Sequence, residues 1–276
     1  MKKKADVDSK PHRERSSPET EPDEGRYLYC IAEGNIAVNF GKSGLQGEEV
    51  YTIPYKDLCA VVHTCPSKPY QSNDQASVQA WVLAHQKVVD KAWDVFGTVI
   101  PMGFDTIIRG DVDADPEKNM KNWLREDYAP LKAKMKAIRG RAEYGVQVFW
   151  DSEIMAQKMT EESAEIKKLR DEIRSKPRGI AYMYRQKLEN LLTKEMEIQA
   201  DRYFQTFYEK IKPHAAELHI EKTKKAENQS MRMLMNLSCL LAKDGSEELG
   251  DELEKIDSLK GFSVRFTGPW PPYSFV

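Results

Sequence analysis

Residues 143–151, EYGVQVFWD, decide the fold of the second half of the chain. Large apolar side chains stand at every second position of this stretch: Tyr144, Val146, Val148 and Trp150. A period of two places these four side chains on one face of a β-strand. An apolar strand face must be covered by another layer of structure. The stretch therefore predicts a sheet strand that packs against helices.

The segments after this strand alternate between helical and extended patterns. A long charged region at about 152–212 carries apolar residues at helical spacing, and SKPRG at 175–179 predicts a break between a first helix and a longer second one. Strands are expected at 216–224, 230–242 and 261–268, and a short helix at 245–259. The order β-α-β-β-α-β with an enlarged first crossover predicts a ferredoxin-like, four-stranded antiparallel sheet with helices on one face.

The strand at 230–242, SMRMLMNLSCLLA, is unusually rich in methionine. Strict alternation would put six residues on one face: Met231, Met233, Met235, Leu237, Cys239 and Leu241. Methionine is flexible and polarizable, so this stripe could form an adaptable binding surface. The burial habits of methionine favour the simpler interpretation, in which the stripe fills the core between sheet and helices.

The first half of the chain mixes strands and helices without regular alternation. Strands are expected at 25–33, 50–55 and 58–65, and an extended stretch broken at Pro101 and Gly103 is expected at 98–108. A glycine-rich loop is expected at 34–48, and helices at 77–95 and 114–138. With a boundary near Gly140, the sequence predicts an α+β protein of two domains. The N-terminal α+β domain spans 26–140, and the C-terminal ferredoxin-like domain spans 141–276, with the helical insertion at about 152–212.

Composition excludes several classes of protein. The 42 Lys and Arg nearly balance the 44 Asp and Glu, which predicts no strong field for nucleic acid or membrane. No apolar run approaches the roughly 18 residues of a membrane span. Residues 1–25 are charged and rich in Ser and Pro without an apolar segment, so we expect a disordered tail rather than a secretory signal. The four cysteines lack CxxC spacing and are expected to be reduced in the cytosol.

No motif for catalysis or for a cofactor is present. GKS at 41–43 suggests a phosphate loop, but that motif needs a glycine five residues before Gly41, where Ile36 stands. His214 and His219 have no nucleophile-bearing motif around them. We therefore expect neither an enzyme nor a cofactor-binding protein.

Cys59, His63 and Cys65 share one face of a predicted strand and suggest a soft metal site. Alternate residues on one strand diverge too little to wrap a tetrahedral ion, and no fourth ligand lies nearby in sequence. The favoured interpretation is an ordinary half-buried strand face without a metal.

The chain ends in FTGPWPPYSFV at 266–276, where prolines impose an extended path on a run of aromatic residues. Such a tail either packs on its own domain or forms a docking strip. Soluble proteins seldom leave three large aromatics exposed together, which favours packing. Phe275 is expected to remain the most available, because termini fray. The candidate residues for packing or interaction are Trp270, Pro271, Pro272, Tyr273 and Phe275.

The closing motif GPWPPYSF resembles that of the gas vesicle GvpF/GvpL proteins. Further stretches resemble the family in the right order: RYLYCIAEG, VYTIPYKDLCAVV, LAHQKVVDKAW, TVIPMGFDTII and AEYGVQVFWD. The family commonly has Pro-x-Arg-Phe-Gly in the fourth of these stretches. Here Gly103 replaces the arginine and Asp105 the glycine, so no role of that arginine carries over.

The resemblance implies a two-domain α+β protein whose C-terminal domain is a modified ferredoxin-like fold with a long helical extension. It implies a minor structural or assembly component of gas vesicles, without catalytic activity or cofactor. The implied partners are the small hydrophobic main shell protein (GvpA-type) and other accessory proteins, at the gas-facing surface of the vesicle within the cytoplasm. The alternative is a ferredoxin-like module that binds RNA or a small ligand. That module needs paired aromatics among basic residues, where the last strand offers Arg265 between Phe262 and Phe266.

Overall fold

The structure is a computed structural model that describes the chain except for residues 1–23, 112–114, 227 and 229. The predicted disorder of the first 23 residues thus lies outside the described residues. Strand β1 (Glu24–Glu33) begins before the expected boundary, because Glu24 pairs with Pro66 and Gly25 with Cys65. These two residues belong to the first sheet and not to a tail.

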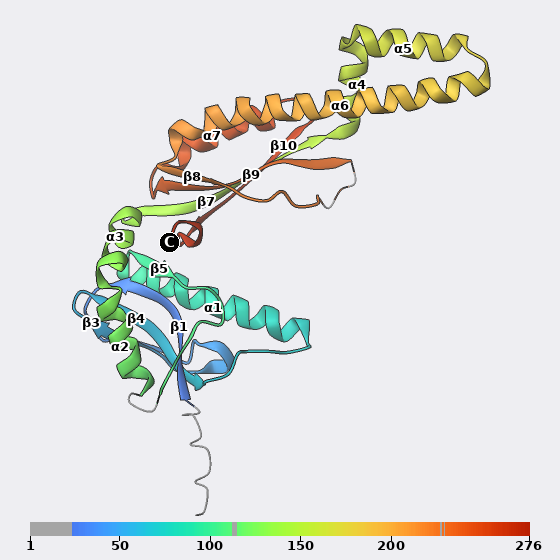
Figure 1. The fold of residues 1–276 in the computed structure, drawn as a ribbon. Coiled ribbons are helices and arrows are strands. Elements are labelled where there is room, and N and C mark those ends of the chain that lie inside the picture. The colour runs from blue at the N-terminus through green and yellow to red at the C-terminus, as the bar shows by residue number, and fades with distance from the viewer. Residues whose placement is uncertain (1–23, 112–114, 227, 229) are drawn as a thin grey trace, which may run out of the picture.

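The N-terminal half is built on a sheet of short and long strands (Figure 1). Its order is β2-β3-β4-β1-β5, and β6 pairs with β1 beside β5. Besides β1, the strands are β2 (Asn39–Gly41), β3 (Val50–Tyr55), β4 (Leu58–Pro66), β5 (Val99–Pro101) and β6 (Ile107–Arg109), and a 3-10 turn η1 (Leu45–Gly47) precedes β3. The pairs formed by β1 are antiparallel.

Helices cover both faces of this sheet. Helix α1 (Gln75–Phe96) packs Val88, Val89 and Ala92 on the face that carries Tyr27 and Tyr29. Helices α2 (Pro116–Glu126) and α3 (Tyr128–Ile138) pack on the opposite face. That face is filled by apolar residues of the strands and the two helices, among them Leu28, Ile31, Val62, Met120, Leu124, Leu131 and Met135. The central strands are therefore buried on two sides.

The helix expected at 77–95 is present as α1. Asp74 caps its start by accepting hydrogen bonds from the amides of Ala76 and Ser77, and Gly97, at φ +74°, ends it. The single helix expected at 114–138 is wrong within the described residues, because α2 ends and α3 begins at Asp127. Pro130 has no N–H to donate to the carbonyl of Glu126, so one continuous helix would lose a hydrogen bond there.

The C-terminal half holds a four-stranded sheet with the order β10-β7-β9-β8, in which all neighbours are antiparallel. Its strands are β7 (Arg141–Asp151), β8 (Glu217–Ile220), β9 (Met231–Ala242) and β10 (Phe262–Trp270). Along all eleven residues of β7, buried and half-buried side chains alternate strictly. Tyr144, Val146, Val148 and Trp150 are the buried ones, together with Ala142, as the alternation predicted.

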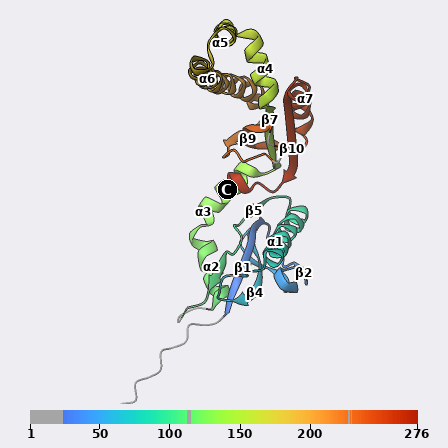
Figure 2. The ribbon, with the colours of Figure 1, turned by 90° about the vertical axis from the view of Figure 1, so that its right-hand side faces the viewer.

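Helices α6 (Arg178–Ile211) and α7 (Ser246–Asp257) cover one face of this sheet, where Phe207 and Leu249 meet Val146. Helices α4 (Ser152–Glu162) and α5 (Ala164–Ser175) run beside the first part of α6 and project from the molecule (Figures 1 and 2). The break expected at 175–179 is present. A second break at Ser163, whose hydroxyl caps α5, was not expected and divides the first helix in two. Two further 3-10 turns are η2 (Lys212–His214) and η3 (Tyr273–Phe275).

The expected methionine stripe on β9 is divided between two faces. Val148 pairs with Met235 and Phe149 pairs with Met233, so Leu234 is an extra residue that forms a β-bulge. Met235 stays on the helix-covered face with Leu237, Cys239 and Leu241. Met231 and Met233 turn to the open face, because one inserted residue reverses the side of every residue beyond it.

The two halves meet at a seam that contains the C-terminus (Figures 1 and 2). Leu240 of β9 packs with the α2–α3 side of the first sheet, and Trp93 of α1 packs against the core of the second. The Lys243 ammonium lies 4.2 Å from the centre of the Trp93 ring. No helix in the described part of the chain is long and apolar enough to cross a membrane.

Candidate interaction surfaces

The C-terminal tail turns away from β10 where it passes β7. Gly268 has φ +124°, and a Cβ there would lie 2.8 Å from the Glu143 carbonyl and the Tyr144 ring, so only glycine fits. Pro271 and Pro272 beyond it are buried. Trp270 and Tyr273 on either side of them are 40% and 38% exposed. The tail is thus anchored by its prolines and presents two aromatics at the surface.

Ser274 fastens the tail to the open face of the second sheet. Its amide and hydroxyl donate to the two carboxylate oxygens of Glu143 at 2.8 and 2.7 Å, and its hydroxyl lies 3.1 Å from that of Ser238. The Phe275 ring lies 4.5 Å from the His219 ring and packs, with Val276, against the first half. The expectation that Phe275 would be the most available aromatic is therefore wrong. Its contacts with both halves hold the terminus down, and Trp270 and Tyr273 are more exposed.

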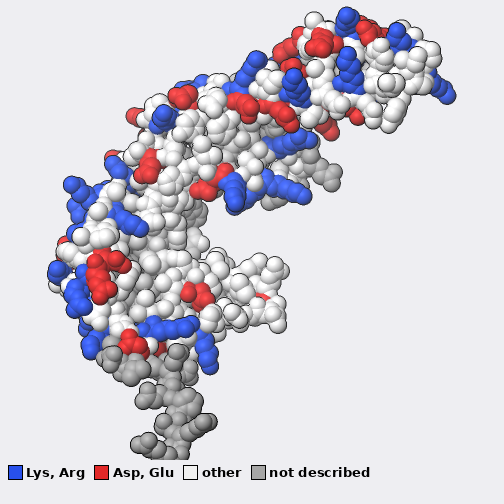
Figure 3. Space-filling view, viewed as in Figure 1, with Lys and Arg blue, Asp and Glu red and all other residues white. Residues whose placement is uncertain are grey.

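Beside the tail is an apolar hollow of about 470 Å³. Its lining comes mainly from Ile100, Met102, Trp123, Leu131, Tyr273 and Val276. Asp127 and Lys134 are the charged residues of the lining, and Figure 3 shows the recess around the C-terminus as a largely uncharged surface. The sequence pointed to the tail, but it did not show that Trp123 and Leu131 would lie beside it.

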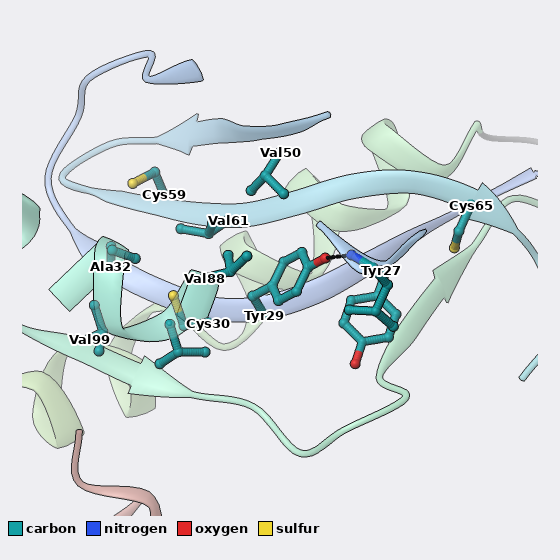
Figure 4. Close-up of a cluster of buried hydrophobic side chains, with 13 residues drawn as sticks. Tyr27, Tyr29, Cys30, Ala32, Val50, Cys59, Val61, Cys65, Val88 and Val99 are labelled. Atoms are coloured by element: carbon teal, nitrogen blue, oxygen red, sulfur yellow. Dashed lines mark hydrogen bonds between the residues drawn. The ribbon is translucent and has the colours of Figure 1, made fainter. Parts of the chain in front are cut away.

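Cys59, His63 and Cys65 are fully buried rather than half-buried, which corrects the expectation. Figure 4 shows both cysteines on β4, above the tyrosines of β1. The two ring nitrogens of His63 are engaged, since Nδ1 lies 2.8 Å from the Tyr29 hydroxyl and Nε2 lies 2.9 Å from the Tyr70 hydroxyl. Among the described residues, no group of His, Cys, Asp and Glu side chains is placed to hold a metal ion.

A second buried histidine repeats this arrangement. His85 Nδ1 lies 2.9 Å from the Tyr27 hydroxyl, and its Nε2 lies 3.1 Å from the carbonyl of Met102. Burial lowers the pKa of both His63 and His85 to about 4, so each ring is neutral near pH 7. With their nitrogens occupied inside a closed core, these histidines are structural.

The open face of the second sheet holds another hollow, of about 690 Å³. Phe149, Met231 and Met233 line it, and Arg265 lies 5.9 Å from the centre of the Phe149 ring. An RNA platform on this sheet would need paired aromatics. The lining of this hollow includes two phenylalanines, Phe149 and Phe266, and the ring of Phe266 stacks on Tyr144 of the helix-covered core.

The two phenylalanines of β10 pack against the helix-covered core. Phe262 contacts the rings of Tyr203 and Phe207, and Phe266 stacks on Tyr144. Among the described residues that line this hollow, Phe149 is therefore left without a second aromatic platform, and the alternative function is not favoured.

Comparison with known families gives a match over residues 25–276 to the model described as gas vesicle synthesis protein GvpL/GvpF. The chain belongs to this family. The resemblance inferred from the closing motif and the five stretches before it is thereby confirmed. Membership supports a role in gas vesicles.

Individual relatives agree with this assignment. The chain is 28% identical over 258 residues to gas vesicle protein L1 of Halobacterium salinarum, with 91% of this chain and 90% of the relative covered. It is 24% identical over 258 residues to gas vesicle protein F of a Nostoc species, with 91% and 97% covered. The crystal structure of gas vesicle protein GvpF from Anabaena sp. PCC7120 has a TM-score of 0.73 at 21% identity, covering 91% and 98%, and so shares the mixed helix-and-strand fold.

Proposed function

We propose that this family member is a minor structural or assembly protein that binds the small, hydrophobic main shell protein while gas vesicles form. It acts at the gas-facing surface of the vesicle within the cytoplasm, alongside other accessory proteins. The observation that carries the proposal is the apolar hollow beside the tail, where Trp270 and Tyr273 stand exposed next to buried prolines. No catalytic step is part of this function.

The physical need for such a protein is clear. Shell subunits with large apolar surfaces would associate nonspecifically before assembly, because water favours burying any exposed patch of that size. A partner with a preformed apolar hollow covers such a surface transiently. The charged residues on its helices keep the complex soluble.

Tyr273 lines the hollow and Trp270 is exposed on the same tail, and exposed aromatics are well suited to this contact. Interfaces draw most of their binding free energy from a few large side chains, and tryptophan and tyrosine are prominent among them. Anchoring by Pro271, Pro272 and Ser274 holds Trp270 and Tyr273 in place before the partner arrives. Less conformational entropy is then lost on binding.

We further propose that the chain divides near Gly140 into an N-terminal α+β domain, 26–140, and a C-terminal domain, 141–276. The order β10-β7-β9-β8 with antiparallel neighbours supports a modified ferredoxin-like fold for the second, with residues 152–212 as its helical extension. In this arrangement the proposed binding site lies at the seam between the domains.

The test is capture of the co-expressed main shell protein by the full-length chain. We expect Trp270→Ala and Tyr273→Ala each to weaken binding about tenfold or more. Ile36→Ala is the matched control, because Ile36 is a large exposed apolar residue, 53% exposed, on the loop after β1. It should bind like the parent chain. Thermal melting of each variant separates loss of binding from loss of fold.

Two outcomes would contradict the proposal. In the first, both tail variants bind the shell protein as the parent does. In the second, Trp270→Ala lowers the melting temperature and loses binding only in proportion to the unfolded fraction, which would make the tail structural.

A further inference from the structure

The distal end of the helical extension is strongly basic. Between Lys167 and Lys187 the chain has eight Lys or Arg residues and two acidic residues, Asp171 and Glu172. All eight cations are exposed, at positions 167, 168, 170, 174, 176, 178, 185 and 187. Figure 3 shows basic side chains at this outer end of the molecule. The whole chain carries a net charge of −2, so this end differs sharply from the rest.

The same end exposes large apolar side chains. Ile180, Tyr182 and Met183 of α6 are 48%, 60% and 69% exposed. Apolar residues grouped at the tip of a projecting arm, within a rim of like charge, are typical of a docking surface. We call the residues 167–187 the basic tip.

A complementary surface lies on α7 of the same chain. The segment 244–257 holds seven acidic residues and one lysine. Glu247, Asp251 and Glu254 recur at spacings of four and three, so they lie on one face of α7, and Asp244 lies in the turn just before the helix. All four are exposed, and within the described residues none of them forms an ion pair. We call these four residues the acidic stripe.

A hollow of about 340 Å³ adjoins the end of α7. Ile154, Tyr203, Leu259 and Phe262 form the apolar part of its lining, and the polar part comes from Gln157, Lys158, Glu161 and Lys260. This hollow can receive one of the exposed apolar side chains of a basic tip. Helices α5 and α7 each have twelve residues, about 18 Å long, so the two charged surfaces also match in length.

The tip of one molecule cannot reach the stripe of the same molecule. Helix α6 is one continuous helix of 34 residues, and α7 packs near its far end, where Lys210 pairs with Glu252 at 3.0 Å. From Ile180 to Lys210 the helix rises by roughly 45 Å, which holds the tip away from α7. The contact must therefore join two molecules.

We propose that copies of this chain associate head to tail, with the basic tip of one copy docked on the acidic stripe and adjoining hollow of the next. When two copies join through two different surfaces, one copy keeps a free tip and the other a free stripe. Further copies can therefore add to form an open chain, or the chain can close into a ring. The proposal goes beyond the binding of the shell protein and does not depend on it, because Trp270 and Tyr273 lie on neither surface.

The first measurement is sedimentation velocity of the full-length chain in 0.05 M and 0.5 M NaCl. At low salt we expect species of at least twice the 31.7 kDa monomer mass that increase with protein concentration. At high salt they should dissociate, because added ions screen the attraction between exposed charges. A monomer at all concentrations in 0.05 M NaCl would overturn the proposal.

Charge reversal identifies the two surfaces. The tip variant replaces six cations with glutamate, at Lys168, Arg170, Arg174, Lys176, Arg178 and Lys187, and the stripe variant replaces Asp244, Glu247, Asp251 and Glu254 with lysine. All ten positions are exposed, so both variants should melt like the parent chain. Each variant alone should be monomeric at low salt, since its tip and its stripe then carry the same sign.

An equimolar mixture of the two variants should associate again, because each acidic tip then meets a basic stripe. Restoration by mixing is expected only if tip and stripe touch each other. Variants that fold normally yet remain monomeric when mixed would overturn the proposal. Binding of the basic tip to anionic phospholipid vesicles, together with a monomeric parent chain, would assign the tip to a lipid surface instead.

Discussion

The two sheets of this protein differ in how many of their faces are covered. In the first sheet, β1 and β4 are buried on both sides, under α1 on one face and under α2 and α3 on the other. In the second sheet, β7 is buried on one side only and alternates along its whole length. A sheet covered on both sides can serve as a rigid base. A sheet with an open face leaves a surface on which a tail and a partner can lie.

The C-terminal tail contacts both sheets, the open face of the second and the covered first. Ser274 bonds to Glu143 on the open face of β7, while Phe275 and Val276 pack against the closed first sheet. The open face of one sheet thus receives the segment that ties it to the other. The apolar hollow beside Tyr273 exists because the tail bridges the two halves.

The largest expected effect comes from a substitution in the core of the first sheet, which is covered on both faces. Leu28→Ala removes a side chain with no exposed surface and should lower the free energy of unfolding by about 2–5 kcal/mol, through lost burial and the cavity left behind. Phe149→Ala, on the open face, should cost about 1 kcal/mol, although a larger side chain is removed. Urea titration of both variants checks this. An equal cost would mean that the two sheets are equally covered.

The second effect is a dependence of stability on pH that comes from two buried histidines of the first half. His63 and His85 have pKa values of about 4 in the folded chain, through burial, against an ordinary value of about 6.5. The unfolded chain therefore binds more protons between these values. Stability is complete above pH 6.5 and is lost as the pH falls toward 4, by about 2 kcal/mol per histidine at pH 5.

Unfolding measured from pH 7 to pH 5 tests this expectation. His85→Gln keeps a hydrogen-bonding side chain beside Tyr27 and should remove about half of the pH-dependent loss. A loss of the same size in the variant would show that other groups cause it.

A smaller effect concerns the link between the sheets. Ser274→Ala removes the hydroxyl that donates to Glu143, and we expect a cost of about 1–2 kcal/mol because the acceptor is charged. Ser263→Ala is the control on the neighbouring strand, where the serine is exposed, and it should change stability by less than about 0.5 kcal/mol. Equal melting of both variants would show that the tail is not anchored there.

The sequence predicted the one-sided sheet better than the two-sided one. The spacing of Tyr144, Val146, Val148 and Trp150 reports directly which side chains are buried, since a period of two is a local property. The strands of the first sheet are continuous apolar runs, which indicate burial without showing which helix covers which face. Family membership was also accessible from sequence, because the closing motif is specific.

Other features depend on contacts between distant residues. The bulge at Leu234 reversed Met231 and Met233, and nothing in the local alternation marks that extra residue. Tyr27 and His85 are 58 positions apart, so their pairing needs the assembled fold. The order of exposure within the tail was not predicted, because Phe275 is held by His219 of β8, 56 positions away in the chain.

The central claim is that the tail and its hollow bind the main shell protein while the rest of the second sheet remains open. Hydrogen exchange of the full-length chain, alone and in complex with co-expressed shell protein, tests it most directly. We predict that protection increases at residues 100–103, which line the hollow, and along the tail at 270–276, of which Tyr273 and Val276 line it. Protection should be unchanged at the open-face residues 231–233 and in the arm at 167–187. New protection confined to the open face or to the arm, with the tail unchanged, would contradict the account.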